Sequence, residues 1–313
     1  MPKWKILLTD GLNEKGKSIL DAEAHMDDRN GISPDELLQV ASEYDAIIVR
    51  SRTKLTAPIL KAAANLKVIG RAGVGLDNID LESVRKHDIT VLNTPTASSN
   101  SVAELTVAMM FALARKISAA DSSMKAGEWN KKQLAGFELS GKTLGIIGVG
   151  NIGSLVAEKA TNLGMHVLAC DIDCLDEHIK FFGALPTGTE KICAQSDFIS
   201  LHIPMTEENR GLINRSTIQQ MKTGVYLINT ARGGLIDESA LLEALNAGKI
   251  AGAALDVFCI EPPGYTDLVG HPNVIATPHI GAQTLEAQSR TAEHIAKEVL
   301  AALRGEALHW KVS

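Results

Sequence analysis

The sequence has few cysteines, few aromatic residues and no long apolar run. Four cysteines occur in 313 residues, and nothing completes a zinc-ligand set beside Cys170 and Cys174. We therefore expect reduced thiols and no metal site. Aromatic residues make up only 4%, which argues against a base-stacking surface for nucleic acid. No run approaches the roughly 18 apolar residues of a membrane span, and the N-terminal apolar run is too short for a signal peptide. These absences predict a cytoplasmic protein that does not bind a membrane.

The sequence also has fewer basic than acidic residues. Lysine and arginine total 31 against 37 aspartates and glutamates, and the net charge of −6 is wrong for a protein that binds nucleic acid through a basic surface. Apolar residues make up 45% and charged residues 22%, as in ordinary globular proteins, which excludes disorder, collagen and a disulfide scaffold. At roughly 150 residues per domain, this length predicts about two domains.

Short apolar runs alternate with helical stretches along most of the chain. Several are continuous runs of Val, Ile and Leu, which is typical of strands buried on both faces of a parallel sheet. The expected strands form two series: Lys5–Thr9, Ala46–Val49, Lys67–Ile69 and Ile89–Leu92, then Thr143–Gly148, His166–Ala169, Phe198–Ile203, Val225–Asn229, Gly252–Val257 and Val274–Ala276. The alternation predicts an α/β fold with two doubly wound parallel sheets that divide near residue 97.

A helix is expected just after this division. Ser101 to Glu104 matches a capping box, and the helix should run to about Arg115. Because this segment is apolar on most sides, it should be buried in the core or in a subunit interface.

A glycine-rich turn follows the first strand of the second series. Gly148, Gly150 and Gly153 form the pattern Gly-x-Gly-x-x-Gly between a strand and a helix. The first glycine permits a tight turn, the second lets a pyrophosphate approach the backbone, and the third allows the helix to pack closely on the strand. The start of the helix offers free N–H groups to an anion. We interpret the pattern as a dinucleotide site; the alternative is a plain strand-to-helix turn.

An acid at the end of the next strand supports this interpretation. Asp171 lies about 20 residues further on, where a carboxylate bonds the ribose hydroxyls. It would repel a 2′-phosphate, and no arginine follows within two residues, so NAD is favoured over NADP. Gly70–Gly75 is also glycine-rich after a strand, but it lacks the third glycine and the acid that a second dinucleotide site would need.

Three other segments carry a polar residue just beyond an expected strand, namely Arg232, Glu261 and His279. Ligands of open α/β sheets bind beyond the carboxyl ends of the strands, so these side chains should converge on the dinucleotide edge. Hydride transfer from an alcohol needs a proton acceptor, and histidine titrates in the useful range. A neighbouring carboxylate would hold its tautomer, and an arginine fork would bind a substrate carboxylate. Taken singly, the three could be a turn arginine, a surface glutamate and a capping histidine.

With these motifs, the sequence resembles the D-isomer-specific 2-hydroxyacid dehydrogenase family over essentially its whole length. The segments that carry the resemblance are Gly70–Asn78, Val149–Gly153, Asn229–Gly234, Leu255–Phe258 with Glu261-Pro262, and Pro278–Ala282. The resemblance implies a Rossmann NAD-binding domain over residues 98–282 and a flavodoxin-like substrate-binding (lid) domain over 1–97 plus 283–313, with a cleft between them. It implies an NAD-dependent oxidoreductase that interconverts a 2-hydroxy acid and its 2-keto acid, and a homodimer or higher oligomer formed through the Ser101–Arg115 region.

The resemblance also implies three sets of site residues. His279 would be the acid/base, Glu261 its partner and Arg232 the ligand of the substrate carboxylate. The NAD site would be lined by Gly148, Gly150, Asn151, Ile152, Gly153, Asp171, His202, Ile203, Pro204, Thr230, Ala231, Arg232, Asp256, His279 and Ala282. The substrate site would be lined by Arg50, Ser51, Arg71, Gly73, Val74, Lys131, Arg232 and His279.

The choice of substrate depends on cations of the lid loops. In members that act on 3-phosphoglycerate such cations receive the distal anion, and Arg50, Ser51 and Arg71 match that pattern. Lys131 falls where those members often have an arginine from the partner subunit, and Ser98 where the family usually has an asparagine. A lysine is a point charge rather than a fork. The predicted substrate is 3-phosphoglycerate or a similar acid with an anionic tail, and sulfolactate, hydroxypyruvate and glyoxylate are alternatives.

Two other classes of function are also considered. An NAD-sensing binding protein of the same fold could retain Arg232, Glu261 and His279, although the lack of long disordered tails favours the enzyme. A hydrolase with tightly bound NAD would need a lysine or a cysteine at the reacting centre, and these motifs offer neither.

Overall fold

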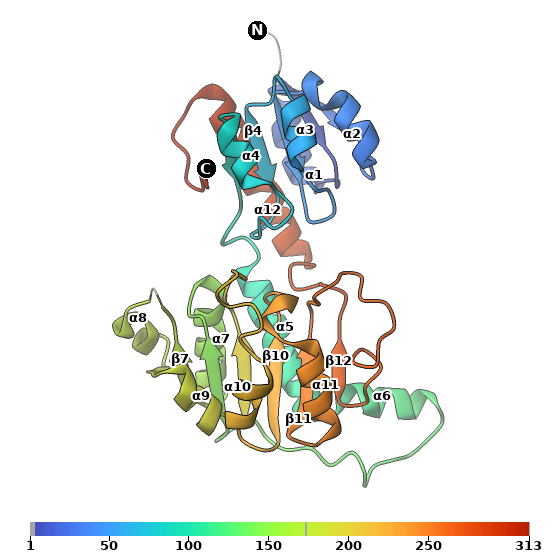
Figure 1. Cartoon of the computed structure of the whole chain (residues 1–313), viewed down its shortest axis with the longest axis vertical. Coiled ribbons are helices and arrows are strands. Elements are labelled where there is room, and N and C mark those ends of the chain that lie inside the picture. Colours follow the sequence, from blue (N-terminus) through green and yellow to red (C-terminus); the bar gives the residue numbers. More distant parts are fainter. Residues whose placement is uncertain (1–3, 173, 313) are drawn as a thin grey trace. The chain divides into compact units, whose positions relative to one another are not determined.

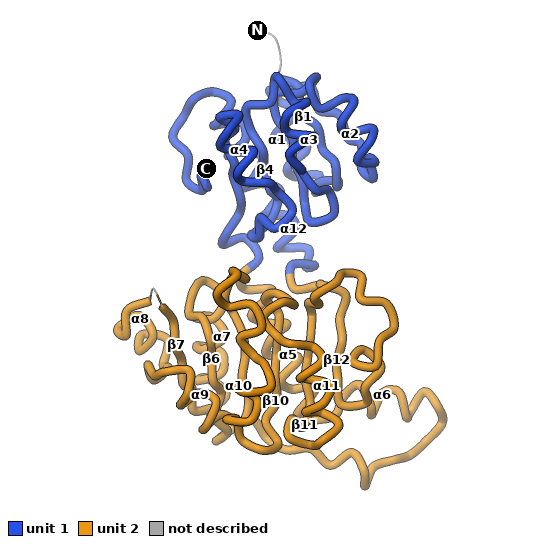
Figure 2. Tube along the Cα trace, viewed as in Figure 1, with its two compact units in different colours: residues 1–98, 282–313 blue, residues 99–281 orange. Residues whose placement is uncertain are grey.

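The computed structural model describes residues 4–172 and 174–312, which form two compact units (Figure 1, Figure 2). The first unit comprises residues 1–98 and 282–313, and the second comprises residues 99–281. Each unit is built on one sheet in which every pair of neighbouring strands is parallel.

The first unit has a five-stranded sheet in the order β2-β1-β3-β4-β5. Its strands are β1 (Trp4–Leu8), β2 (Ala24–Asp28), β3 (Ala46–Val49), β4 (Val68–Arg71) and β5 (Thr90–Leu92). Its helices are α1 (Glu14–Asp21), α2 (Pro34–Val40), the 3-10 turn η1 (Ala41–Glu43), α3 (Ala57–Ala62), α4 (Leu81–Lys86) and α12 (Leu285–Arg304). This is the flavodoxin-like order, in which the direction of winding reverses between β1 and β3.

The last helix of the chain completes the core of the first unit. α12 packs against α1 and β4, and its Ile295 and Val299 are fully buried. The backbone of β4 is close to this helix, because a Cβ on Gly70 would lie 2.7 Å from Cγ2 of Val299. A larger residue at Gly70 would therefore clash with side chains of α12.

The second unit has a seven-stranded sheet in the order β12-β11-β10-β9-β6-β7-β8. Its strands are β6 (Thr143–Ile147), β7 (His166–Cys170), β8 (Leu185–Pro186), β9 (Phe198–Leu201), β10 (Val225–Asn229), β11 (Ile250–Leu255) and β12 (Val274–Ala276). Its helices are α5 (Ser99–Ala114), α6 (Ile117–Lys125), α7 (Asn151–Asn162), α8 (Asp176–Phe181), α9 (Thr189–Gln195), α10 (Arg215–Gln220), the 3-10 turn η2 (Gly233–Leu235) and α11 (Glu238–Asn246). The winding reverses between β6 and β9, as in a Rossmann fold.

Two apolar layers cover the second sheet. One is formed with α5 and α7 and includes Met110 and Val156, and the other is formed with α9 and α11 and includes Ile192 and Leu241. Because both faces are covered, the central strands are apolar throughout, which is the pattern that predicted them.

The predicted fold class is confirmed, and each expected strand is present with its ends shifted by at most a few residues. The strands β2 and β8 were not predicted. The capping box at Ser101 is wrong, because α5 begins at Ser99 and Ser101 lies within its first turn. Glu104 instead accepts a hydrogen bond from the side chain of Asn100 at 2.7 Å.

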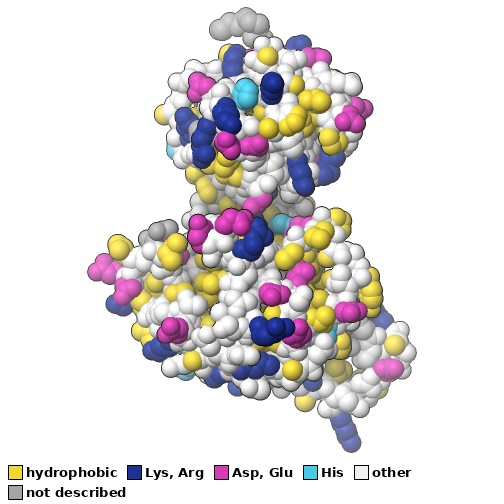
Figure 3. All heavy atoms as spheres, in the orientation of Figure 1, with side chains coloured by type: hydrophobic (Ala, Val, Ile, Leu, Met, Phe, Trp, Pro, Cys, Tyr) yellow, Lys and Arg dark blue, Asp and Glu magenta, His cyan; other side chains and the backbone are white. Residues whose placement is uncertain are grey.

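The surface of α5 is only partly covered within the unit. Met109 and Met110 are buried, but Phe111 is 41% exposed and Ile117, at the start of α6, is 54% exposed. Across the face drawn in Figure 3, lysines and arginines are interspersed with carboxylates. Within the described ranges, no helix combines the length and the apolar character that a membrane crossing requires.

Candidate active site

The glycine turn joins β6 to α7, and each of its three glycines has its own spatial reason. Gly148 has φ +96°, and a Cβ there would lie 2.6 Å from the carbonyl oxygen of His202. A Cβ on Gly153 would overlap the carbonyl oxygen of Gly148, so only glycine lets α7 start this close to the strand. A Cβ on Gly150, the N-cap of α7, would have no neighbouring atom within 4 Å. The backbone at Gly150 is therefore open to a ligand.

This geometry predicts that alanine at Gly153 affects stability, whereas alanine at Gly150 affects NAD binding. Gly153→Ala should destabilise the protein by about 1–3 kcal/mol, because the methyl group has no room. Gly150→Ala should leave stability nearly unchanged and weaken NAD binding. Gly188→Ala is the matched control, since Gly188 is also a helix N-cap with open space around it. Thermal melting and NAD titration measure the two effects. Equal NAD affinities of Gly150→Ala and Gly188→Ala would show that no ligand approaches Gly150.

The end of β7 lies beside the glycine turn. Oδ2 of Asp171 accepts a hydrogen bond from the backbone N–H of Val149 at 2.6 Å, and Gly148 N–H donates to the carbonyl of Cys170 at 2.9 Å. Asn151 and Ile152 form the first turn of α7, with Asn151 exposed. The acid and the open glycine backbone therefore lie on the same edge of the sheet.

The end of β9 closes the other side of the turn. Nε2 of His202 is hydrogen-bonded to Ser200 Oγ at 2.8 Å, whereas its buried Nδ1 has no partner among the described residues. Burial lowers the pKa of His202 to about 3, so the ring is neutral at physiological pH. Ile203 packs against the apolar core and Pro204 follows, exposed. His202 thus packs against Gly148 and Gly153 of the glycine turn, and its Nδ1 is an unsatisfied buried polar atom at this edge of the sheet.

The end of β10 is shaped by Asn229, a residue of the Asn229–Gly234 motif for which no role was predicted. Asn229 is buried, and its side chain accepts from Ala231 N–H at 3.1 Å and donates to the carbonyl of Arg232 at 2.8 Å. Thr230 Oγ1 pairs with Thr106 Oγ1 of α5 at 2.9 Å. The guanidinium of Arg232 donates to the carbonyl of Ala231 at 2.6 Å. Asn229 thus holds the turn that carries Arg232.

The segments after β10 and β11 lie in direct contact. A Cβ on Gly233 would overlap the backbone of Phe258, so glycine is needed where the two segments meet. Phe258 N–H donates to Oε1 of Glu261 at 3.1 Å. The turn that carries Arg232 is therefore packed against the segment that carries Glu261.

His279 follows β12 and faces this glutamate. Its Nδ1 lies 2.7 Å from Oε2 of Glu261, and the two side chains are 45% and 38% exposed. A carboxylate can only accept, so Nδ1 carries the proton and Nε2 is left as an acceptor. His279 has φ +53°, an uncommon backbone conformation for a residue other than glycine.

Asp256, at the end of β11, holds this histidine segment. Its carboxylate is 1% exposed and accepts from Thr277 Oγ1 at 2.6 Å and from the N–H groups of Ile280 and Gly281, both at 2.8 Å. These partners lie on both sides of His279 in the chain. Asp256 was predicted to line the NAD site; in the structure its oxygens are engaged by the segment that presents His279.

The predicted site residues divide between the two units. The second unit brings Arg232, Glu261 and His279 together, after the adjacent strands β10, β11 and β12. The first unit contains Arg50, Ser51, Arg71, Gly73, Val74 and Ala282. In that unit Arg71 donates to the carbonyl of Ala72 at 3.2 Å, and its guanidinium fills the space where a Cβ on Gly73 would lie.

Lys131 is not brought to the other site residues of its unit. It is exposed in the segment between α6 and β6. Six residues later Phe137 packs against Phe198 and Tyr226, at the amino ends of β9 and β10, whereas His279 follows the carboxyl end of β12. In the described part of the chain, no three His, Cys, Asp or Glu side chains are grouped so that they could hold a metal ion.

Residues 107–281 match the family model described as D-isomer specific 2-hydroxyacid dehydrogenase, NAD binding domain. The chain is 46% identical to a D-3-phosphoglycerate dehydrogenase of Methanocaldococcus jannaschii over 96% of its own length and 58% of that protein's. The chain thus spans a little over half the length of that curated relative. It is 44% identical to a hydroxypyruvate reductase of Thermotoga maritima, over 96% of this chain and 98% of the relative.

A solved structure shows the same architecture. D-lactate dehydrogenase from Aquifex aeolicus, complexed with NAD and lactic acid, superposes with a TM-score of 0.85 at 34% identity, over 96% of each chain. The similarity therefore extends over both units and is not limited to the glycine turn.

Proposed function

The chain belongs to the D-isomer specific 2-hydroxyacid dehydrogenase family, and on that premise we propose that it is an NAD-dependent oxidoreductase that interconverts a 2-hydroxy acid and its 2-keto acid. The observation that carries the proposal is the hydrogen bond between His279 and Glu261, with 2.7 Å between Nδ1 and Oε2. The segment of Glu261 packs against the turn that carries Arg232. All three residues follow strands whose carboxyl ends lie at the same edge of the sheet as the glycine turn. Residues 99–281 are the proposed NAD-binding domain, and residues 1–98 with 282–313 the proposed substrate-binding domain.

The residues at this edge fit NAD. When bound, NAD supplies the acceptor for the hydride that leaves C2 of the hydroxy acid. The open backbone at Gly150 and the start of α7 suit its pyrophosphate, and Asp171 suits its ribose hydroxyls. His202, which packs against Gly148 and Gly153, is a further proposed lining residue. Ile203, Pro204, Thr230, Ala231 and Ala282 are proposed to complete the lining.

His279 is the proposed acid/base. In the oxidative direction its Nε2 accepts the proton of the C2 hydroxyl, and in the reductive direction it returns that proton to the carbonyl oxygen. Glu261 accepts the Nδ1–H at 2.7 Å, which fixes the tautomer and stabilises the imidazolium. Arg232 supplies a planar fork for the C1 carboxylate, and so orients C2 relative to His279.

The proposed substrate is 3-phosphoglycerate or a similar acid with an anionic tail. Arg50, Ser51, Arg71, Gly73 and Val74 are the proposed contacts of the substrate in the first unit, with Arg50 and Arg71 as the cations. Sulfolactate, hydroxypyruvate and glyoxylate are the alternatives. Lys131 in place of an arginine and Ser98 in place of an asparagine are the two positions that bear on this choice.

A panel of 2-keto and 2-hydroxy acids tests the proposed function. The change in absorbance of NAD(H) and NADP(H) is followed with 3-phosphohydroxypyruvate, hydroxypyruvate, glyoxylate, pyruvate and sulfopyruvate. Turnover of at least one keto acid with NADH is expected, and the highest kcat/KM should fall on an acid with an anionic tail. A protein that binds NADH but turns over none of these acids would be an NAD-binding protein rather than the proposed enzyme.

The choice of cofactor gives a separate prediction. Asp171→Ala should raise KM for NADH and reduce the difference between KM for NADH and KM for NADPH. The reason is that the variant loses both the ribose ligand and the charge that repels a 2′-phosphate. Stability must be measured in parallel, since Asp171 also accepts the Val149 N–H. A wild-type protein that uses NADPH faster than NADH would overturn the assignment.

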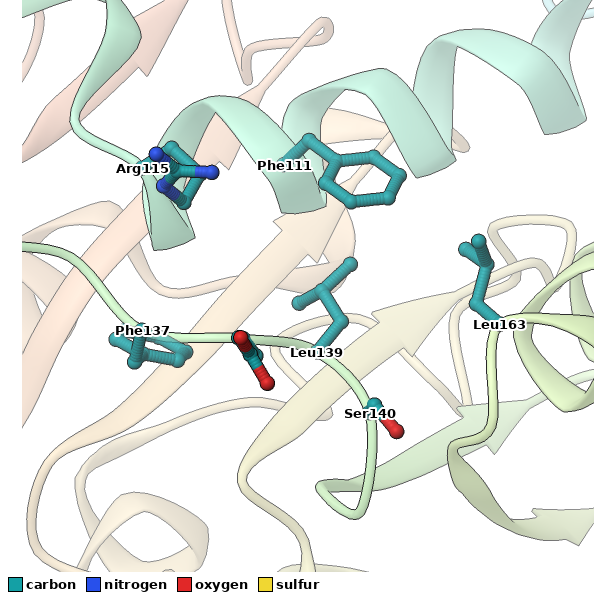
Figure 4. A pocket seen from close by; sticks show the side chains of 7 residues that line it. Phe111, Arg115, Phe137, Leu139, Ser140 and Leu163 are labelled. Carbon is teal, nitrogen blue, oxygen red and sulfur yellow. The ribbon is translucent and has the colours of Figure 1, made fainter.

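A homodimer and a cytoplasmic location are also proposed. Phe111 and Ile117 are not the only exposed apolar residues in this region. Met124 of α6 is 55% exposed, and Trp129, in the segment after α6, is 78% exposed. Phe111 also lines a small cavity of about 240 Å³, shown in Figure 4. Its other lining residues are Arg115, Phe137, Glu138, Leu139, Ser140 and Leu163. A second copy of the chain would cover this apolar surface. The four free cysteines suit a reducing compartment.

A further inference from the structure

A short loop at the carboxyl edge of the first sheet carries two of the proposed substrate contacts. This loop, Arg50–Thr53, directly follows β3, and Asp10 lies just beyond β1. β1 and β3 are neighbours, and the winding of the sheet reverses between them. Crevices at such reversal points are where open α/β sheets bind ligands. Two side chains outside the loop determine its conformation.

The carboxylate of Asp10 holds both ends of the loop. Its Oδ2 accepts the backbone N–H groups of Arg50 at 2.7 Å and of Thr53 at 3.1 Å. Its Oδ1 accepts Thr53 Oγ1 at 2.6 Å and lies 2.9 Å from Nη2 of Arg52. The Asp10 side chain is only 4% exposed. Four donors therefore converge on one buried carboxylate.

The side chain of Asn78 holds the same two residues by their carbonyl groups. Its Nδ2 donates to the carbonyl oxygen of Arg50 at 2.8 Å and to that of Thr53 at 2.6 Å. Asp10 and Asn78 thus satisfy both the N–H and the C=O groups at each end of the loop. Such a loop has little freedom to change shape.

This arrangement distinguishes the two arginines of the loop. Arg52 is neutralised by Asp10 and also donates to the carbonyl of Thr9 at 2.5 Å. Within residues 4–172 and 174–312, neither the guanidinium of Arg50 nor the backbone N–H groups of Ser51 and Arg52 have a hydrogen-bond partner. A guanidinium and two successive N–H groups are a suitable donor set for a phosphate or a sulfonate.

We propose that Asp10 and Asn78 are positioning residues that hold the Arg50–Thr53 loop in the shape that recognises the distal anion of the substrate. Arg52 takes part in this clamp, and Arg50 is the cation of the loop that contacts the anion. The inference rests on the proposed function and adds to it two residues that contact no substrate themselves.

Asp10→Asn tests the proposal. An amide presents a donor in place of one oxygen, so at least two of the four donors lose their acceptor. KM for 3-phosphohydroxypyruvate should rise about tenfold or more, while kcat/KM for glyoxylate, which has no tail, should change less than about threefold. Asn78→Ala should act in the same direction. Amide hydrogen exchange of the peptide that contains residues 50–53 should be faster in both variants.

Asp45→Asn is the matched control. Asp45 precedes β3 at the opposite end of the same strand, and it also accepts a backbone N–H, from Lys5 at 3.0 Å, and a cation, Lys67, at 2.9 Å. This variant should also lose some stability, but it should keep the ratio of the kcat/KM values for the two keto acids. If Asp10→Asn affects both keto acids equally, or no more than Asp45→Asn does, the positioning role is wrong although the enzyme assignment stands. If wild type reduces no keto acid of the panel with NADH, the proposed function and this inference both fail. If it reduces only acids without an anionic tail, this inference fails and the enzyme assignment stands.

Discussion

Replacing His279 with alanine is expected to lower kcat by roughly 10²–10⁴-fold, the usual contribution of a general acid or base. The reason is the pair with Glu261, which occupies Nδ1 at 2.7 Å and leaves Nε2 as the acceptor for the hydroxyl proton of the substrate. NAD should still bind, because the glycine turn and Asp171 follow other strands. Steady-state kinetics with NADH and the best keto acid, together with a titration of NAD, measure both quantities.

Two further variants make this result specific to the imidazole. His279→Asn introduces asparagine, a residue that tolerates φ +53°. Its loss of turnover therefore cannot be assigned to backbone strain. His166→Ala removes an exposed histidine at the start of β7 and should leave kcat unchanged. Near-normal turnover in His279→Ala would mean that the histidine is structural. Glu261→Gln should lower kcat less than either His279 variant, because the base itself remains.

Arg232→Ala is expected to lower kcat/KM by roughly 100-fold or more, because hydrogen bonds to charged groups contribute about 1.5–3 kcal/mol each and two are lost from the substrate carboxylate. Arg232→Lys should recover only part of this loss, since a lysine keeps the charge but not the fork. The effect should be similar for every 2-keto acid, with or without an anionic tail, because all share the C1 carboxylate.

The control for Arg232 is another arginine of the same unit. Arg215 is exposed and paired with Glu243 on the surface, so Arg215→Ala should leave kcat/KM unchanged. If Arg232→Ala discriminates between substrates with and without an anionic tail, Arg232 contacts the tail and its assignment to the carboxylate is wrong.

The strands of both sheets could be predicted from the sequence because central parallel strands are apolar on both faces. β3 shows this most clearly, with all four of its residues buried. β2 and β8 escaped prediction because they are edge strands. β2 has the sequence Ala-His-Met-Asp-Asp with a single buried residue, and β8 has two residues, one of them Pro186. Neither carries a periodic apolar signal.

The start of α5 shows a different limit of sequence patterns. Ser101 and Glu104 have the spacing of a capping box, but the helix begins at Ser99, so Ser101 lies inside it. A local motif could not reveal this, because the choice between two nearby serines depends on what buries them. Both Ser99 and Ser101 are buried in the folded unit.

The meeting of the segments that carry Arg232, Glu261 and His279 could be predicted because parallel strands bring their carboxyl ends to one edge of the sheet. That rule needs only the position of a residue just after a strand, as for Arg232 and His279. The same rule places Asp256 and Asp10 just after β11 and β1, but it cannot assign their supporting roles. Asp10 binds Arg50 N–H across 40 positions of sequence, and Asp256 holds both sides of the His279 turn through side-chain geometry.

The most direct test of hydride transfer is the fate of a deuterium label. NADH deuterated at the transferable position of C4 is incubated with the protein and 3-phosphohydroxypyruvate or glyoxylate, and the product is analysed by mass spectrometry. The proposed reaction predicts a 2-hydroxy acid that carries a single deuterium at C2, formed by the wild-type protein and at a far lower rate by His279→Ala. A hydroxy acid without the label, or NADH that stays unconsumed with every keto acid of the panel, would contradict it.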